Sequence, residues 1–218
     1  MTKHNRVVIE TGSKKVFASA IDWPGWSRSG KTEEQALEIL AGYVDRYRNV
    51  ADLAGVDGLD ASDFDIVEYQ TGSGATDFGV PEHVAMVEHE PMTDVECERQ
   101  LKLLRACWTY FDDVAARVSD ELRKGPRGGG RNRQKIVFHT LEAERSYART
   151  IGVKTPKGGM DSPQGLRDHR DAVCEAVRAV NAAGEETKWP VRYFLRRAAW
   201  HVLDHAWEME DKDLTESS

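Results

Sequence analysis

The chain has 218 residues, a formal net charge of −7, and 40% hydrophobic and 31% charged residues, as in globular proteins with a sizeable core. The acidic balance argues against a general nucleic-acid-binding protein, because binding to phosphates requires a positive surface, although a local basic patch is not excluded. No apolar run approaches the roughly 20 residues that cross a bilayer, and the polar start is unlike a signal peptide. We therefore expect a cytoplasmic protein with no membrane partner.

The three cysteines, Cys97, Cys107 and Cys174, are odd in number and lack any Cys-x-x-Cys spacing. All three fall within expected helices. This pattern favours reduced core thiols over a disulfide framework or a thiolate zinc site.

Residues 1–75 predict a small α+β module. Two short strands flank a turn and suggest a hairpin, and Thr32 then precedes a helical pattern with two glutamates in its first turn. A third segment alternates like a strand and is followed by residues of loop composition. The expected elements are strands at 5–10, 15–21 and 64–69, a helix after Thr32, a loop at 71–75 and a linker at 76–92.

From Thr93 onward the pattern is helical, and we expect residues 93–214 to form an up-down four-helix bundle as the main, all-α domain. Thr93 with Glu96 is a capping-box signature, and apolar residues then recur at alternating spacings of four and three as far as Leu122. Glycine and proline then demand an exposed loop. The remaining expected elements are the loop at 124–130 and helices over about 131–151, from Ser162-Pro163 toward Gly184, and from Pro190.

The most informative feature is the pair His201 and His205 in the expected fourth helix. Residues four apart lie one turn apart on the same helix face, so both imidazoles can reach a single divalent cation. His139 is the other histidine in a strongly helical, apolar-periodic segment, and three neutral imidazoles suit zinc, nickel or ferrous iron with a coordination position left open. The alternative is a set of hydrogen-bonded core histidines. The remaining histidines, His4, His83, His89 and His169, are placed in the tail, in the linker and near the start of the third helix.

Ionisable residues share the histidine face of the fourth helix. Arg197 and Glu208 lie on this face, where burial is costly unless the groups are paired or coordinated. Glu142, Asp204 or Glu208 could orient an imidazole, and Glu208 is favoured because it shares the face. Arg197 and Glu208 are thus the candidate catalytic residues. The alternative for Arg197 is an ion pair with an acidic residue.

A basic run surrounds three consecutive glycines before the second helix. No aromatic residues are interleaved to stack on bases, so we interpret it as a solvated loop rather than an anion or RNA contact. The run consists of Lys124, Arg127, Arg131, Arg133 and Lys135.

Residues 25–32, Gly-Trp-Ser-Arg-Ser-Gly-Lys-Thr, formally satisfy the phosphate-binding pattern G-x-x-x-x-G-K-T. A nucleotide-hydrolysing fold needs a buried parallel sheet, however, and only three short strands are expected before the helices. Trp26 also places bulk where such a loop must wrap closely around phosphate. We therefore do not expect a nucleotide site here.

Residues 93–212 resemble the DinB-like (YfiT-type) bundle superfamily, whose members carry one histidine on the second helix and a His-x-x-x-His pair on the fourth. His139, His201 and His205 match these positions in order and in helix placement. The resemblance implies a divalent-metal site, a homodimer and, in characterised branches, metal-dependent transfer of low-molecular-weight thiols such as bacillithiol or mycothiol. In such a reaction the metal would bind the thiol sulfur as thiolate, and Arg197 could hold a carboxylate of either reactant.

Residues 18–26 and 30–37 resemble the HicB-like antitoxin fold, in which a strand ends in a Pro-Gly turn and a Gly-x-Thr-x-Glu-Glu-Ala-Leu segment starts a helix. The sequence lacks a visible DNA-binding region of the kind that a HicB antitoxin carries. The resemblance therefore implies a module that aids dimerisation or covers the pocket of the bundle. Trp23 and Trp26 could line that pocket, or pack within the module.

These patterns together predict a metal-binding protein that catalyses thiol transfer or related chemistry on a small-molecule substrate. Two alternatives stay open: a non-catalytic ligand-binding or stress-response protein built on the same bundle, and an antitoxin-like regulator acting through the N-terminal module. We expect a divalent metal as cofactor, a low-molecular-weight thiol as partner, and no nucleic acid.

Overall fold

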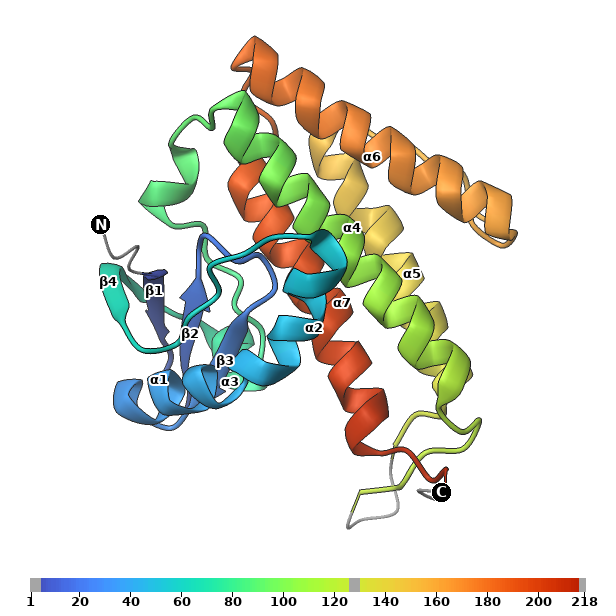
Figure 1. Ribbon diagram of the computed structural model, residues 1–218, viewed down its shortest axis with the longest axis horizontal. Coiled ribbons are helices and arrows are strands. Elements are labelled where there is room, and N and C mark those ends of the chain that lie inside the picture. Colours follow the sequence, from blue (N-terminus) through green and yellow to red (C-terminus); the bar gives the residue numbers. More distant parts are fainter. Residues whose placement is uncertain (1–4, 126–129, 216–218) are drawn as a thin grey trace.

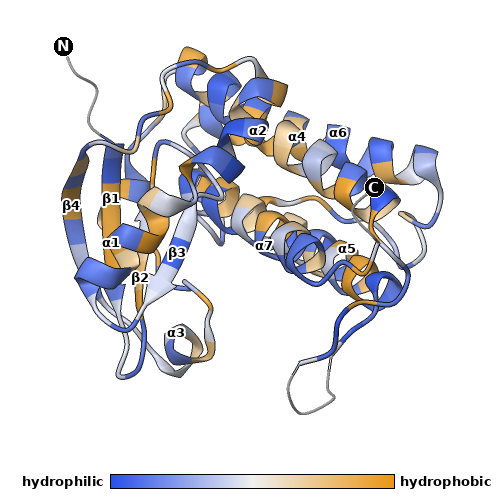
Figure 2. Ribbon diagram, turned by 60° about the horizontal axis from the view of Figure 1, so that its bottom comes forward, coloured by the Kyte–Doolittle hydropathy of each residue, from blue (hydrophilic) through white to orange (hydrophobic). Residues whose placement is uncertain are grey.

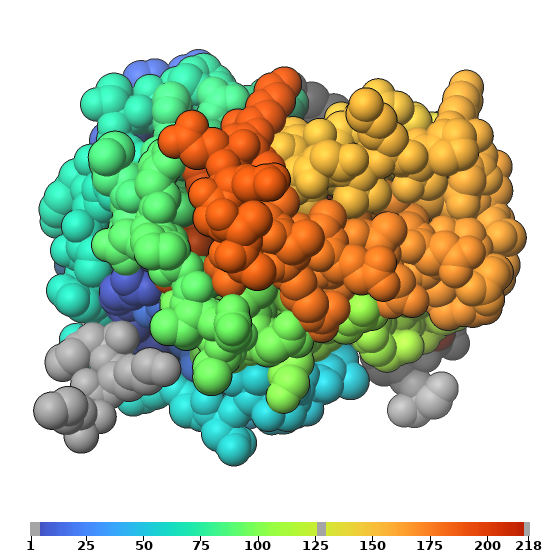
Figure 3. Space-filling view, turned by 90° about the horizontal axis from the view of Figure 1, so that it is seen from above, coloured from blue at the N-terminus to red at the C-terminus, as the bar shows by residue number. Residues whose placement is uncertain are grey.

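The computed structural model describes residues 5–125 and 130–215. Within these ranges the N-terminal part contains a four-stranded sheet with short helices, and four long helices follow it (Figure 1). The expected combination of an N-terminal α+β part with a helical C-terminal part is confirmed. Seen from above, the segments from α6 to the start of α7 form a continuous surface beside the N-terminal part (Figure 3).

The sheet has the strand order β3-β2-β1-β4. Strands β1 (Asn5–Thr11) and β2 (Val16–Ala20) form the expected antiparallel hairpin, with Val7 opposite Ala20. Strand β4 (Phe64–Thr71) confirms the third expected strand and pairs with β1 in parallel. β4 is an edge strand whose residues alternate between half-buried and exposed, and it is more hydrophilic than β1 and β2 (Figure 2).

Strand β3 (Ser27–Gly30) was not expected from the sequence. Its residues, Ser-Arg-Ser-Gly, lack the β-branched and aromatic side chains that mark strands, and the strand forms because β2 offers an edge to pair with. The residues that match G-x-x-x-x-G-K-T thus lie in a turn at Gly25, in β3 and at the cap of a helix. Since β3 pairs antiparallel, this is not the strand-loop-helix geometry of a phosphate-binding loop.

The expected helix after Thr32 is present but divided. The Thr32 side chain accepts a hydrogen bond from the Gln35 N–H and caps α1 (Glu33–Gly42), and α2 (Val44–Ala54) begins after a break at Tyr43. The prediction of a loop at 71–75 was wrong at both of its ends. Thr71 closes β4, and a capping box at Ser73 starts the one-turn helix α3 (Gly74–Phe78), because Ser73 and Thr76 satisfy each other's backbone N–H groups.

Within the expected linker, η1 (Met86–His89) forms a short 3-10 helix. The first long helix is α4 (Asp94–Arg117), and the Thr93 side chain caps it by accepting from the Glu96 N–H. The helix ends earlier than predicted, because Val118 has an extended backbone. Val118 and Leu122 are nevertheless buried. The apolar spacing therefore correctly marked buried residues at these two positions, although they lie beyond the end of the helix.

The other three long helices are confirmed. They are α5 (Arg133–Ala148), which continues into the 3-10 turn η2 (Arg149–Ile151), α6 (Pro163–Ala183) and α7 (Val191–Asp211). Ser162 caps α6, Pro163 occupies its first turn, and Gly184 ends it in the left-handed region. Part of the expected loop at 124–130 lies outside the described residues. No helix in the described ranges has the length and apolar content needed for a membrane span.

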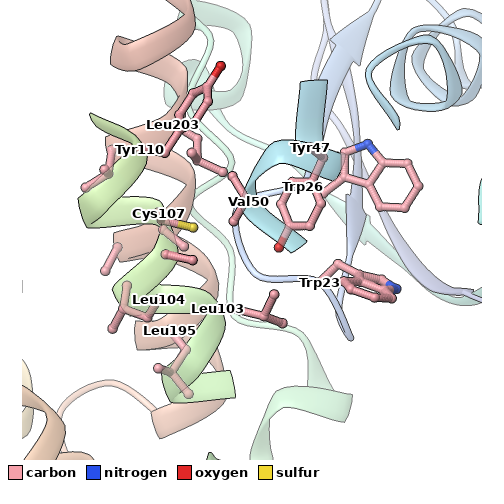
Figure 4. Close-up of a cluster of buried hydrophobic side chains, with 14 of the residues drawn as sticks. Trp23, Trp26, Tyr47, Val50, Leu103, Leu104, Cys107, Tyr110, Leu195 and Leu203 are labelled. Atoms are coloured by element: carbon pink, nitrogen blue, oxygen red, sulfur yellow. The ribbon is translucent and has the colours of Figure 1, made fainter. Parts of the chain in front are cut away.

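A single apolar cluster joins the sheet to the long helices. Trp26 is fully buried, stacks on Tyr47 with ring centroids 5.7 Å apart, and donates from Nε1 to the Leu40 carbonyl. Trp26 therefore packs inside the N-terminal part and lines no pocket. Figure 4 shows side chains of this part meeting those of α4 and α7. The cluster includes Trp23, Trp26, Tyr47, Val50, Leu103, Leu104, Cys107, Leu195 and Leu203.

The three cysteines are buried and free, as expected for core thiols. Burial raises the pKa of Cys174 to about 11, so this thiol stays protonated at neutral pH. The division into domains at residues 76–92 stays a prediction.

Candidate metal centre

Helices α5 and α7 bring three histidines together. His139 comes from α5, and His201 and His205 come from α7, with one ring nitrogen of each lying within 4.8 Å of the others. The ring centroids are 5.1 Å apart for His139 and His201, 5.0 Å for His139 and His205, and 4.6 Å for the α7 pair. The predicted convergence of these imidazoles is confirmed, and the three together could hold a metal ion.

The local folding explains this convergence. His201 and His205 are one turn apart on the same face of α7, and both are 7% exposed. His139 lies on the exposed side of α5, so the cluster opens toward solvent on that side. Metal–nitrogen bonds of about 2.1 Å place two ligands roughly 3.4 Å apart in a tetrahedral site, so small side-chain rotations close the observed spacing.

Two imidazoles of the cluster are kept neutral, which is the form that binds metals. Burial, together with the nearby His205 and Arg197, lowers the pKa of His201 to about 2. Burial and His205 also lower the pKa of His139. At neutral pH these two rings therefore carry free lone pairs and bind a cation without first losing a proton.

Glu208 holds His205 through a hydrogen bond to its ring. Its Oε2 is 2.8 Å from His205 Nδ1, which fixes Nδ1–H as the donor and leaves Nε2 as the metal-binding nitrogen. Lys212 Nζ and Arg131 Nη2 also donate to this carboxylate, at 2.7 and 3.0 Å. Burial raises the pKa of Glu208, but the hydrogen bonds from His205 and Lys212 and the charge of Arg131 outweigh it and lower the pKa to about 2.

The two other acidic candidates have different partners. Glu142 accepts from Arg145 at 2.7 Å, and Asp204 accepts from Arg28 at 2.9 Å. The guanidinium carbon of Arg28 lies 4.1 Å from the ring centroids of both Tyr43 and Trp207, and these two rings pack edge to face with centroids 5.2 Å apart. Of the three acids considered from the sequence, only Glu208 is hydrogen-bonded to a histidine of the cluster.

The interpretation of the basic run as a solvated loop was wrong for two of its residues. Arg131 binds Glu208, and Arg133 binds the Val118 carbonyl and the Asp120 carboxylate. Sequence reasoning missed Arg131 because nothing in a glycine-rich basic segment identifies which arginine folds back onto the next helices. Arg127 lies outside the described residues.

Arg197 has no acidic partner among the described residues. It is 8% exposed, and its Nη1 is buried without a hydrogen-bond partner. Its guanidinium carbon lies 4.6 Å from the Trp200 ring and 5.3 Å from the Tyr147 ring, and Tyr147 is in turn 5.6 Å from the His201 ring. The ion pair considered as an alternative for Arg197 is therefore not formed with any described residue.

None of the other described histidines belongs to this cluster. His169 is buried on α6, with Nδ1 2.7 Å from Thr155 Oγ1. His83 and His89 fall in the segment expected as a linker, and His4 is outside the described residues.

The chain matches no family model, no curated protein and no solved structure. The resemblances to DinB-like and HicB-like proteins therefore stay hypotheses drawn from motifs.

Proposed function

We propose that this chain is a divalent-metal-binding protein whose centre is formed by His139, His201 and His205. One observation carries the proposal: three imidazoles from two helices lie within 4.8 Å of one another, and at least two of them are held neutral. Three nitrogen ligands suit zinc, nickel or ferrous iron and leave a position for a small molecule. The exposed side at His139 gives that molecule a route in.

We further propose that α4 to α7 form a DinB-like up-down bundle over residues 93–214, with a HicB-like module before it. The order of the histidines along the helices supports this assignment, as does the turn and capped helix around Thr32. The homodimer and the cytoplasmic location stay predictions. No feature of the described residues supports the alternative of an antitoxin-like regulator, which would bind a toxin or DNA.

Thiol transfer is the reaction we propose for this centre. A bound divalent metal would lower the pKa of a thiol or water held beside it. In the transfer, the thiol sulfur bonds to an electrophilic carbon, the bond from that carbon to its leaving group breaks, and the thiol proton departs with the leaving group. No oxidant or reductant is needed. Glu208 keeps His205 in one tautomer throughout, and Arg131 and Lys212 keep Glu208 charged.

Metal binding is tested first. Metal-free protein titrated with Co²⁺ and Zn²⁺ is expected to bind one ion per chain, and His201→Ala is expected to lose most of this binding, because two nitrogens hold a metal poorly. His169→Gln, which removes a buried histidine elsewhere, is the matched control and should bind like the unaltered protein. Less than about one third of an ion per chain, with no difference between the variants, contradicts the proposal.

Thiol consumption with candidate electrophiles then separates an enzyme from a non-catalytic binding protein. An enzyme loses turnover in His201→Ala while far-UV circular dichroism shows an intact fold. A purely structural metal site instead loses thermal stability on metal removal and shows no metal-dependent turnover.

A further inference from the structure

Three arginines on α7 are buried, and among the described residues only one of them, Arg197, has neither a hydrogen bond nor an ion pair. Arg192 donates to the Glu96 carboxylate and to two backbone carbonyls, and Arg196 donates to the Glu88 carboxylate and to the His83 carbonyl. Arg197 forms no hydrogen bond or ion pair with any described residue, and its Nη1 is enclosed. A buried guanidinium without an anion is costly, so its position calls for a partner that the described chain does not supply.

The surroundings of Arg197 connect it to the histidine cluster. It lies one turn before His201 on α7, and the Tyr147 ring contacts both side chains, at 5.3 Å from the guanidinium carbon and 5.6 Å from the His201 ring. Trp200 forms another wall, and its indole N–H is also buried without an acceptor. The unsatisfied Nη1 of Arg197 therefore lies on a residue one helical turn from the cluster, and a ligand rich in acceptors would satisfy it.

The charges at the centre point the same way. Glu208 is already occupied by His205, Lys212 and Arg131, at the end of the cluster where His205 lies. Neutral histidines do not offset the charge of a divalent metal, and Arg197 adds a further positive charge at the other end. An anionic ligand lowers the free energy of this arrangement more than a neutral one.

We propose that Arg197 is an oxyanion subsite, which binds the carboxylate or sulfonate of a small molecule whose thiol reaches the histidine centre. This inference rests on the proposed metal centre and names the substrate class for it: a thiol that carries an anionic group roughly one helical turn, about 5 Å, from its sulfur. The planar guanidinium binds such a group with two parallel hydrogen bonds. The aromatic walls exclude water that would weaken them.

The test compares three thiols on the cobalt-loaded protein, with the sulfur-to-cobalt charge-transfer absorption as the binding signal. The probes are 3-mercaptopropionate, 2-mercaptoethanesulfonate and neutral 2-mercaptoethanol. At least one anionic thiol is expected to bind about tenfold to a hundredfold more tightly than the neutral one, since hydrogen bonds to charged groups are strong. Whichever anionic thiol binds best identifies carboxylate or sulfonate as the preferred group.

The Arg197→Gln variant is expected to lose this preference while its affinity for 2-mercaptoethanol stays within about twofold. Arg197→Lys, which keeps the charge without the planar fork, should retain part of the preference and guards against misfolding of the first variant. Arg178→Gln removes an arginine from the surface of α6 and is the matched control, expected to behave like the unaltered protein.

Failure of the two proposals is distinguishable. If cobalt loads and the preference is absent, or is unchanged in Arg197→Gln, the subsite is refuted and the metal centre stands. If cobalt does not load, the metal centre is refuted, and the subsite is judged on the metal-free protein. There the anionic thiols must raise the Tm of the unaltered protein and not that of Arg197→Gln, and equal shifts or no shift in both overturn it.

Discussion

Beside His205, the carboxylate of Glu208 accepts hydrogen bonds from three donors. Glu208 accepts from His205 Nδ1, from Lys212 and from Arg131, and these contacts keep its pKa low despite burial, which opposes them. An anion behind an imidazole fixes the tautomer and increases the basicity of the opposite nitrogen. The carboxylate therefore acts on metal affinity through His205 and needs no contact with the metal.

The variant Glu208→Gln is expected to lower metal affinity by about tenfold to a hundredfold, because a neutral amide supports the imidazole less strongly. The measurement is a competition between the protein and a chelating dye for Zn²⁺ or Co²⁺. Glu142→Gln, a glutamate on α5 that binds Arg145 instead, should leave the affinity unchanged. An equal loss in both variants, or in neither, contradicts the role given to Glu208.

At the level of helices and strands, the features that short-range rules govern could be predicted from the sequence. The caps at Thr32, Thr93 and Ser162 and the one-turn spacing of His201 and His205 depend only on neighbouring residues. What could not be predicted depends on partners that the local residue pattern does not mark. Strand β3 forms from Ser-Arg-Ser-Gly because the preceding strand β2 offers an edge to pair with, and Arg131 reaches Glu208 across 77 positions. No local pattern encodes such pairings.

Figure 4 shows where the N-terminal part meets α4 and α7. Gly25 approaches α7 closely. Gly25 has φ 92°, and a Cβ there would lie 2.7 Å from Leu203 Cδ1 and 3.1 Å from the Ala199 carbonyl carbon on α7. The residue that begins the phosphate-binding pattern is therefore a glycine for two structural reasons: its backbone is left-handed, and it packs against the helix that carries two of the cluster histidines.

Gly25→Ala is expected to lower the free energy of unfolding by about 2–4 kcal/mol, since it combines backbone strain with overpacking. Gly42→Ala, at the end of α1 with no atom within 4 Å of its added Cβ, is the matched control and should be neutral or raise stability by about 0.5 kcal/mol. Urea unfolding followed by circular dichroism measures both. A Gly25→Ala protein as stable as the control would contradict the close approach.

On the scale of the whole molecule, buried polar networks connect helices that are distant in sequence. Arg170 of α6 binds Glu144 of α5 and Asp112 of α4, and His169 lies beside this network with Nε2 4.0 Å from Glu144 Oε1. Burial and then the charges of Arg170 and Arg145 lower the pKa of His169 to about 4, so the contact with Glu144 joins a neutral ring to a carboxylate rather than forming an ion pair.

This low pKa makes stability depend on pH. Below the ordinary histidine pKa of about 6.5 the unfolded chain takes up a proton at His169, whereas the folded chain does not until the pH nears 4. The contribution of His169 to the free energy of unfolding is therefore present in full above pH 6.5. It is lost as the pH falls through this window, by about 2 kcal/mol at pH 5 for a ring that is 2% exposed. Other groups titrate over the same range, so the contribution of His169 is a difference between two proteins.

That difference is measured by guanidinium unfolding of metal-free protein at pH 7 and pH 5. The unaltered chain is expected to lose about 2 kcal/mol more than His169→Gln between these pH values, because glutamine does not titrate. The loss between pH 7 and pH 5 is calculated separately for each protein. The contact with Thr155, which His169→Gln lacks at both pH values, therefore does not affect the comparison. If both proteins lose the same amount, or the variant loses more, folding does not lower the pKa of His169, and the ring takes up a proton beside Glu144 at least as readily as in the unfolded chain.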